Sequence, residues 1–372
     1  MEMFRLPTYE TDAMTDLMIE YLREKKDSDT PFFAVMSVQP PHDPYVAPPR
    51  NQAGHLPSQI RFRPNVPPVP SVREQAAREL AGYYAMVENI DQNVGRIVDC
   101  LNETGLMEHT HILFFSDHGD MHGSHGQFRK TTPYQEAVQV PFLISGEKRG
   151  AHAAGRNAGN VDRVPINHVD VAPTSLGLCG IPVPEWMEGT DYSALRLPDR
   201  PRPDYPDSAY LQCVVPTHHH DSVNKAWRGI VTCSGYKYVC FENTDWLLFD
   251  LNEDPYELVN LAHNDKYLPL RRQLREKLQR WIEKTDDTFA LPRECRGCIK
   301  TPSNVWPDWN KNSRNEGWFA WIPDALLSEK AFWFGKRSEN RRRGCLWKNW
   351  YNGSRIISLK YANGSPWIPL ST

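Results

Sequence analysis

The feature that most constrains the fold is a set of short runs that are apolar at successive positions. Two of them are Pro31–Gln39 (PFFAVMSVQ) and His111–Ser116 (HILFFS), and Val140–Ser145 (VPFLIS) has the same character. A strand with one solvent-exposed face alternates apolar and polar residues, whereas a strand covered on both faces is apolar throughout. We therefore expect three buried strands of the kind found in parallel sheets.

Amphipathic segments lie before and between the first two runs. The first extends from Thr11 to Lys25, and the second keeps one apolar stripe at helical spacing over residues 80–101. Ser71 and Glu74 form a capping-box pattern before the second helix, and Gly105 stands where it should stop. The order strand, helix, strand, loop, strand predicts an α/β fold with a doubly wound sheet.

The character of the sequence changes from about Ala209. Residues 227–242 and 245–251 have the pattern of antiparallel strands, and residues 267–284 that of one amphipathic helix packed on them. Beyond residue 290 the chain holds eight of its 12 tryptophans and shows no period, so no element is assigned there. We expect a core, a small C-terminal α+β subdomain and a Trp-rich tail of unknown structure, at residues 1–204, 205–289 and 290–372.

Charge and hydropathy argue against some classes of binding partner. The formal net charge of −3 gives no electrostatic reason to expect nucleic acid or an anionic membrane. No apolar run approaches the roughly 20 residues of a membrane helix. The first residues lack the basic start, apolar middle and cleavage site of a signal peptide. Compartment and oligomeric state are not indicated.

Polar side chains follow two of the predicted strands. Asp117 and His118 come directly after HILFFS, and His42 follows the first strand in PPHDPY. Loops at the carboxyl ends of parallel strands converge, so a shared metal or anion pocket is expected, although Asp117 could instead cap a turn and His42 be a loop histidine. Oxygen ligands favour calcium or magnesium, and Lys130 with His42 would neutralise an oxyanion. Such a set suits transfer or hydrolysis of a sulfate or phosphate ester.

Four blocks of the chain resemble consecutive blocks of the sulfatase family, in the family's order. They are FFAVMSVQPPHDPY, GYYAMVENIDQNVGRIVDCL, HILFFSDHGDMHGSHGQFRKTTPYQEAVQVPFLIS and LLFDLNEDPYELVNLA. The resemblance covers about residues 31–284 and implies an alkaline-phosphatase-like fold with a second, smaller subdomain. Members of the family are often periplasmic, secreted or lysosomal.

The resemblance also implies roles for individual residues. Asp117 and His118 would be ligands of an active-site calcium, or magnesium, and His42 and Lys130 would contact the sulfate. His125 matches a position near the pocket and would bind substrate. His218, in a run of three histidines, would belong to a substrate subsite or else to a polar loop.

One departure from the family concerns the nucleophile. Sulfatases use a formylglycine made from a Cys or Ser in a C/S-x-P-x-R motif, supported by paired aspartates near the N-terminus. No cysteine or serine of this sequence begins that motif, and its one Asp-Asp pair, Asp286-Asp287, ends the late helix. We therefore expect an N-terminally truncated sulfatase without activity of its own, because loss of a nucleophile costs about 10⁶ in rate.

Three explanations follow from that departure: a fragment or truncated gene model, a decayed gene, or a non-catalytic binding protein. In the intact form we expect hydrolysis of a small-molecule or carbohydrate sulfate ester. The alternatives are a phosphonate or phosphodiester hydrolase of the same superfamily and a non-catalytic binder of a sulfated ligand.

Overall fold

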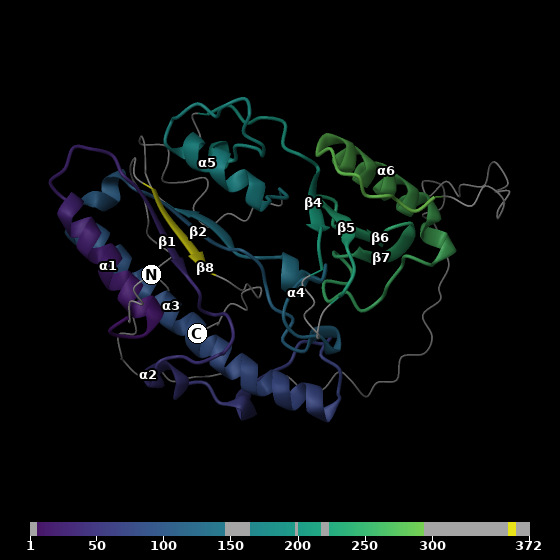
Figure 1. Cartoon of the computed structure of the whole chain (residues 1–372), viewed down its shortest axis with the longest axis horizontal. Coiled ribbons are helices and arrows are strands. Elements are labelled where there is room, and N and C mark those ends of the chain that lie inside the picture. Colours follow the sequence, from purple (N-terminus) through teal and green to yellow (C-terminus); the bar gives the residue numbers. More distant parts are fainter. Residues whose placement is uncertain (1–5, 146–163, 198–199, 217–222, 294–355, 362–372) are drawn as a thin grey trace, which may run out of the picture. The chain divides into compact units, whose positions relative to one another are not determined.

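A computed structural model describes residues 6–145, 164–197, 200–216 and 223–293, and the backbone of residues 356–361. These residues form two four-stranded sheets with helices packed on them (Figure 1). The first sheet has the strand order β1-β8-β2-β3, and the second has the order β4-β5-β6-β7. This arrangement is an α/β fold with an additional antiparallel sheet, as the sequence predicts.

The first sheet is built from strands far apart in the sequence. Its members are β1 (Phe33–Val38), β2 (His111–Ser116), β3 (Phe142–Ser145) and β8 (Ile356–Tyr361). β8 pairs in parallel with both β1 and β2, whereas β3 pairs antiparallel with β2. The tail therefore contributes a strand between two core strands, which sequence periodicity did not reveal.

Two helices cover one face of this sheet, α1 (Glu10–Lys25) and the long α3 (Pro70–Glu103) (Figure 1). Their apolar stripes meet alternate side chains of β1 and β2, and Leu22, Ile97 and Leu101 are fully buried at this contact. On the other face Leu113 packs on Leu178 of α5 (Val171–Leu178). Burial of these apolar surfaces is the main stabilising contribution to the core.

Three details of the predicted elements are wrong. The run Val140–Ser145 does not form a buried parallel strand, because β3 pairs antiparallel with β2 and its residues are only half-buried. Ser71 and Glu74 do not form a capping box: α3 begins at Pro70 after Val69, without a side-chain cap. Proline suits the first helical position because it has no N–H to satisfy there, so Ser71 lies inside the first turn. β1 is not covered on both faces, since alternate residues are exposed, with Phe33 at 63%. The stop at Gly105 fits the structure, where this residue has a φ of 71° just after the helix ends.

The second sheet consists of β4 (Ser208–Cys213), β5 (Trp227–Thr232), β6 (Tyr236–Phe241) and β7 (Thr244–Asp250), all antiparallel. The amphipathic helix α6 (Leu268–Lys284) packs on one face through Leu274, Leu278 and Ile282. The other face contacts Tyr134 and Val138, at and near the short helix α4 (Gln135–Val138). The remaining short helix, α2 (Pro49–Gln52), lies against α3. Among the described residues, no helix combines the length and the hydropathy that a membrane span requires.

Candidate active site

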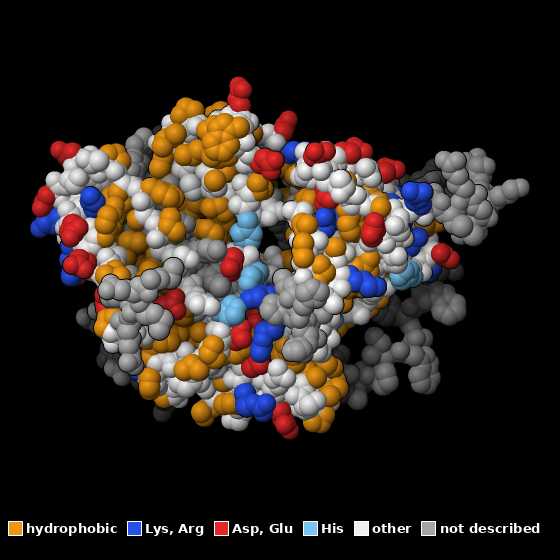
Figure 2. All heavy atoms as spheres, in the orientation of Figure 1, with side chains coloured by type: hydrophobic (Ala, Val, Ile, Leu, Met, Phe, Trp, Pro, Cys, Tyr) orange, Lys and Arg blue, Asp and Glu red, His pale blue; other side chains and the backbone are white. Residues whose placement is uncertain are grey.

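The candidate site lies where β1 and β2 end. Both strands run parallel to β8, so the loops that follow them leave the same edge of the sheet. Figure 2 shows histidine side chains in a hollow of the face drawn, with acidic and basic side chains beside them. The loop after β1 carries His42, and the loop after β2 carries Asp117, His118 and Lys130.

His42 and Lys130 are in direct contact although 88 positions separate them in the sequence. The Nε2 atom of His42 lies 2.6 Å from the Nζ atom of Lys130. His42 Nδ1 lies 2.8 Å from the carbonyl oxygen of Asp43, so it is Nδ1 that carries the proton and donates it there. Nε2 then accepts from the ammonium group of Lys130. The side chain of His42 is 24% exposed, which leaves the pair accessible from solvent.

Asp117 and His118 are placed next to that pair. The backbone N–H of His118 donates to Asp117 Oδ1 over 3.0 Å, and His118 Nδ1 lies 2.9 Å from the carbonyl oxygen of Gly119. Burial lowers the pKa of His118 and outweighs the hydrogen bond to Gly119 and the charge of Asp117, which raise it, while the charge of Lys130 adds to the lowering. His118 is therefore neutral at pH 7, with Nδ1 donating and a lone pair on Nε2. The structure thus places His118 within electrostatic range of Lys130, which contacts His42, and Asp117 is bonded to the backbone of His118.

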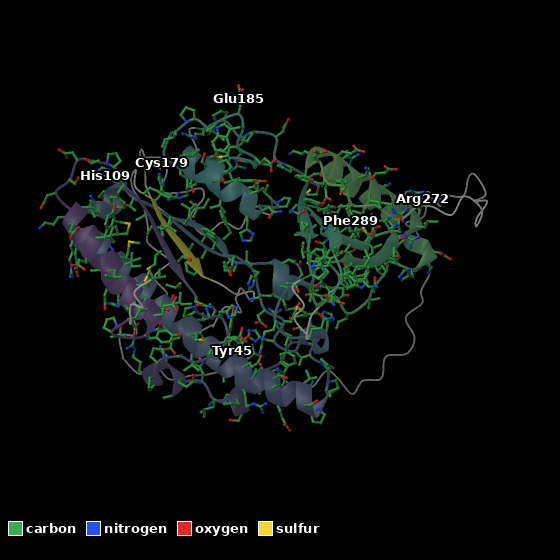
Figure 3. All side chains as sticks on the ribbon, viewed as in Figure 1. Tyr45, His109, Cys179, Glu185, Arg272 and Phe289 are labelled. Atoms are coloured by element: carbon green, nitrogen blue, oxygen red, sulfur yellow. The ribbon has the colours of Figure 1, made fainter. Side chains whose placement is uncertain are left out.

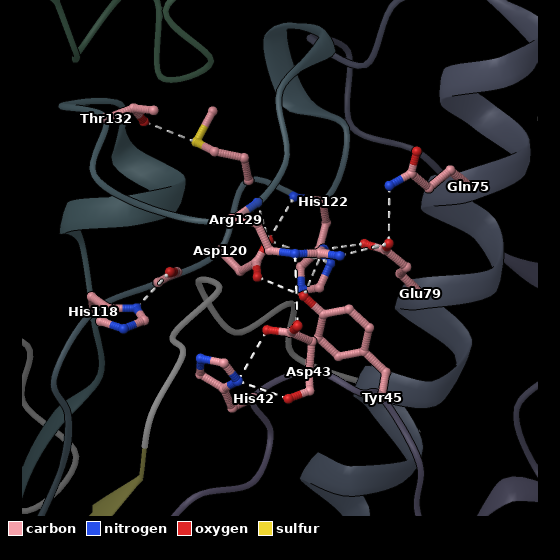
Figure 4. A network of polar contacts seen from close by, with 12 residues as sticks. His42, Asp43, Tyr45, Gln75, Glu79, His118, Asp120, His122, Arg129 and Thr132 are labelled. Carbon is pink, nitrogen blue, oxygen red and sulfur yellow. Dashed lines mark hydrogen bonds and ion pairs between the residues drawn. The ribbon is translucent and has the colours of Figure 1, made fainter. Parts of the chain in front are cut away.

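A buried polar network supports the loop that carries these residues (Figure 4). Asp120, only 2% exposed, accepts hydrogen bonds from Tyr45 Oη at 2.6 Å and from the N–H groups of His122 and Arg129, both at 3.1 Å. Burial alone would raise the pKa of Asp120, but the interaction with His122 and the bond from Tyr45 outweigh it and lower that pKa. The carboxylate is therefore ionised and holds three donors from two loops.

Helix α3 contributes to the same network. Arg129 Nη1 lies 2.8 Å from Glu79 Oε2, so the residue before Lys130 is tied to the helix. Tyr45 packs edge-on against Tyr83 of α3 at a ring distance of 6.4 Å, and Figure 3 shows it beside that helix. Sequence reasoning did not identify Tyr45, Glu79 or Arg129, because their importance comes from contacts between distant segments.

The backbone of this loop is unusual. Four non-glycine residues have a positive φ, namely His122 (42°), His125 (55°), Arg129 (69°) and Thr131 (73°). The left-handed region costs L-residues on the order of 1 kcal/mol each, so it persists only where surrounding contacts impose it. Two of these residues flank Lys130, whose direction is therefore fixed by the loop.

His125 belongs to a neighbouring polar cluster. Its ring stacks on Tyr134 at a distance of 4.0 Å, and its Nε2 atom lies 3.2 Å from Asn65 Nδ2. His125, Glu136 and Glu257 each offer one nitrogen or oxygen atom that could bind a metal ion. These three atoms all lie within 4.8 Å of one another, so the side chains could hold such an ion. Burial lowers the pKa of His125. The substrate-binding role of His125 stays a prediction, and His218 lies outside the described residues.

Comparison with protein families identifies two regions of the chain. Residues 3–181 match the model described as Sulfatase. Residues 123–284 match the model described as N-sulphoglucosamine sulphohydrolase, C-terminal. The overlapping matches together include every strand of the two sheets except β8, and extend to the end of α6.

Individual relatives agree with the family matches. The chain is 31% identical to an ulvan-active sulfatase of Formosa agariphila over 76% of its own length and 53% of that protein's. It superposes on the crystal structure of a putative sulfatase from Bacteroides fragilis with a TM-score of 0.65 and 27% identity, covering 77% of this chain and 61% of that one. A phosphonate monoester hydrolase of Agrobacterium radiobacter shares the fold, with a TM-score of 0.60 and 24% identity over 75% of this chain and 62% of that one. The chain spans about half the length of the curated relatives it matches.

Proposed function

We propose that this chain, which belongs to the sulfatase family, carries part of a centre that hydrolyses sulfate esters. The observation that supports the proposal is the convergence of His42 and Lys130, 2.6 Å apart, on the loop of Asp117 and His118. One relative is named for activity on ulvan, and we infer a carbohydrate sulfate ester as the substrate class.

In this proposal His42 and Lys130 bind the sulfate group. The ammonium group of Lys130 supplies a positive charge, and in a site partly shielded from water such a charge is worth more than in solution. As a bound ester breaks, negative charge grows on its oxygens, and Lys130 stabilises that charge. The short contact with His42 keeps the flexible lysine side chain directed at the same place.

Asp117 and His118 fit a metal ion by their chemistry. His118 presents a lone pair on Nε2 because its Nδ1 atom is bonded to the carbonyl oxygen of Gly119. Asp117 is a carboxylate, and carboxylate oxygens are ligands that calcium prefers. We propose that these two side chains are ligands of calcium, which takes six to eight ligands, so that they supply part of its shell. A bound calcium would draw charge from a sulfate oxygen. The family's formylglycine would provide the nucleophile, and the motif for it is not in this sequence.

The proposal is tested by calorimetric titration of the purified chain with 4-nitrophenyl sulfate in the presence of calcium chloride. Lys130→Ala should weaken binding at least about 10-fold, because the anion loses its main cation. Lys266→Ala removes an exposed lysine of the second sheet region and should leave affinity unchanged. Equal affinity of wild type and Lys130→Ala, or no binding by wild type, would refute the role of the site.

Two further arms separate the alternatives. Tighter binding of phenyl phosphonate than of 4-nitrophenyl sulfate would favour a phosphonate hydrolase. Release of 4-nitrophenol should not occur with this chain, because it lacks the formylglycine motif. Release that disappears in Asp117→Asn would show a complete sulfatase centre and contradict that expectation.

A further inference from the structure

The segment that follows Lys130 is held by side chains from the second sheet. Trp227 of β5 donates from Nε1 to the carbonyl oxygen of Thr131 over 3.0 Å. Lys237 of β6 donates from Nζ to the carbonyl oxygen of Pro133 over 2.7 Å. All of these bonds join residues about 100 positions apart, so they tie the second sheet to the loop of the site.

A buried ion pair completes this contact. Lys237 Nζ lies 2.5 Å from Glu257 Oε1, and both side chains are fully buried. The other oxygen of Glu257 accepts from the backbone N–H of Gln135 over 2.7 Å. Burying two charges is costly unless each finds further hydrogen bonds, and here those bonds are made to the backbone of the loop. The pair therefore has its partners in the very segment that carries the site.

The charges of the neighbouring cluster are balanced. Arg63 Nη1 lies 2.7 Å from Glu136 Oε1, so each buried carboxylate already has a cation, Glu136 from Arg63 and Glu257 from Lys237. Adding a divalent cation beside His125 would leave two uncompensated positive charges in a buried place. An ion-pair contact explains this cluster better than a metal site does.

Lys130 is consequently fixed from both sides. On its N-terminal side the N–H of Arg129 donates to Asp120, and on its C-terminal side the carbonyl of Thr131 accepts from Trp227. Both neighbours of Lys130 have a φ in the left-handed region, which contacts of this kind can impose. The side chain is thereby presented to His42.

We propose that Lys237, Glu257 and Trp227 are positioning residues, through which the C-terminal subdomain sets the direction of Lys130 toward a bound sulfate. The inference rests on the proposed function. It assigns the second sheet a direct part in anion binding, in addition to its contribution to stability.

The test uses 4-nitrophenyl sulfate binding by the full chain, as before. The double variant Lys237→Met/Glu257→Met removes both bonds to the loop without leaving a buried charge unpaired, and should weaken binding about 10-fold. Trp227→Phe removes one bond and keeps most of the packing, and should weaken binding about 3-fold.

Matched controls distinguish positioning from general loss of structure. Asp245 and Arg275 form a half-buried ion pair, 2.8 Å apart, between β7 and α6. Asp245→Met/Arg275→Met should lower the melting temperature yet leave the affinity for 4-nitrophenyl sulfate within 2-fold of wild type. In a Lys130→Ala background, Trp227→Phe should cause no further loss of affinity, since the residue acts through Lys130.

The outcomes separate the two proposals. Absence of binding by the wild type would refute the proposed function itself. The positioning role alone would be overturned if folded Trp227→Phe and the Lys237→Met/Glu257→Met variant bound 4-nitrophenyl sulfate with wild-type affinity. It would also be overturned if Trp227→Phe lowered the affinity of Lys130→Ala by the same factor as it lowers that of wild type. A stoichiometric metal in the purified protein that Glu257→Gln releases would also overturn it, because the carboxylates would then be ligands.

Discussion

Replacement of Asp120 by alanine should destabilise the protein strongly. Asp120 is 2% exposed and accepts three hydrogen bonds, from Tyr45 Oη and from the N–H groups of His122 and Arg129. Alanine accepts none of them, so three donors at the site would lose their partner together. Both N–H groups belong to residues with a positive φ, so the loop also loses contacts that hold its strained backbone.

The magnitude follows from the three donors. A buried donor left without a partner costs about 1–3 kcal/mol. Tyr45 is only half-buried, so the two N–H groups carry most of the penalty. We expect Asp120→Ala to lower the free energy of unfolding by about 3–5 kcal/mol. Asp120→Asn keeps one oxygen acceptor, and its amide can donate to Tyr45, so we expect a loss of about 1–2 kcal/mol.

Urea unfolding, monitored by tryptophan fluorescence, compares the stability of both variants with that of wild type. If the dependence of the unfolding free energy on urea concentration is unchanged, a shift of the midpoint reports a change in stability. Tyr45→Phe is the control at the side-chain donor: it removes the bond to Asp120 and the bond accepted from Arg129 Nη1 at 3.2 Å, and should lose about 1–2 kcal/mol. A loss below about 1 kcal/mol for Asp120→Ala, or equal losses for the Ala and Asn variants, would refute the reasoning about the three bonds.

Two more predictions concern the α3 contact and an acidic side chain. A Cβ atom at Gly82 would lie 2.1 Å from the backbone oxygen of Tyr45, so Gly82→Ala should cost about 1–3 kcal/mol in urea unfolding. Gly54→Ala should cost little, because a Cβ atom there would lie at an ordinary contact distance of 3.6 Å from the backbone oxygen of Asn51. The hydrogen bond from Arg228 lowers the pKa of Asp287 from 3.8 to about 2, so its stabilisation is complete above pH 4 and is lost as the pH falls through 2. After discounting for solvent screening, wild type should lose about 1 kcal/mol more between pH 4 and 2 than Asp287→Asn, and equal losses would contradict this.

Sequence patterns predicted the elements whose signals are local. The stripe over residues 80–101 became α3, and HILFFS became β2, buried at every position. The antiparallel strands after residue 226 and helix α6 were also predicted. Their signals, the alternation of apolar and polar residues and the helical spacing of apolar residues, can be recognised within one short segment of sequence. The α/β fold followed from their order.

The rest depends on contacts between distant segments. Phe33 and Val35 look like buried strand residues, yet whether a face is covered depends on what packs there, and both are exposed. β8 pairs with β2 although it lies more than 200 positions further along the chain. The periodicity of a short segment cannot predict a pairing over that distance. Within the site, the residue types at His42, Asp117, His118 and Lys130 suggested the chemistry.

The residues that support the site could not be predicted from the sequence for the same reason. Tyr45, Glu79 and Glu257 are ordinary residues in their local sequence, and only the fold brings them to Asp120, Arg129 and Lys237. Sequence placed His125 with the candidate substrate pocket, while its contacts are with Asn65 and Tyr134.

The most direct test of the central claim is a crystal structure of the chain grown with calcium and sulfate, with anomalous scattering used to locate the cation. The proposal predicts one sulfate within hydrogen-bond distance of Lys130 Nζ and next to the ring of His42, beside a cation bound by Asp117 and His118. A cation held instead by His125, Glu136 and Glu257, or a sulfate bound away from Lys130 in well-ordered crystals, would contradict it.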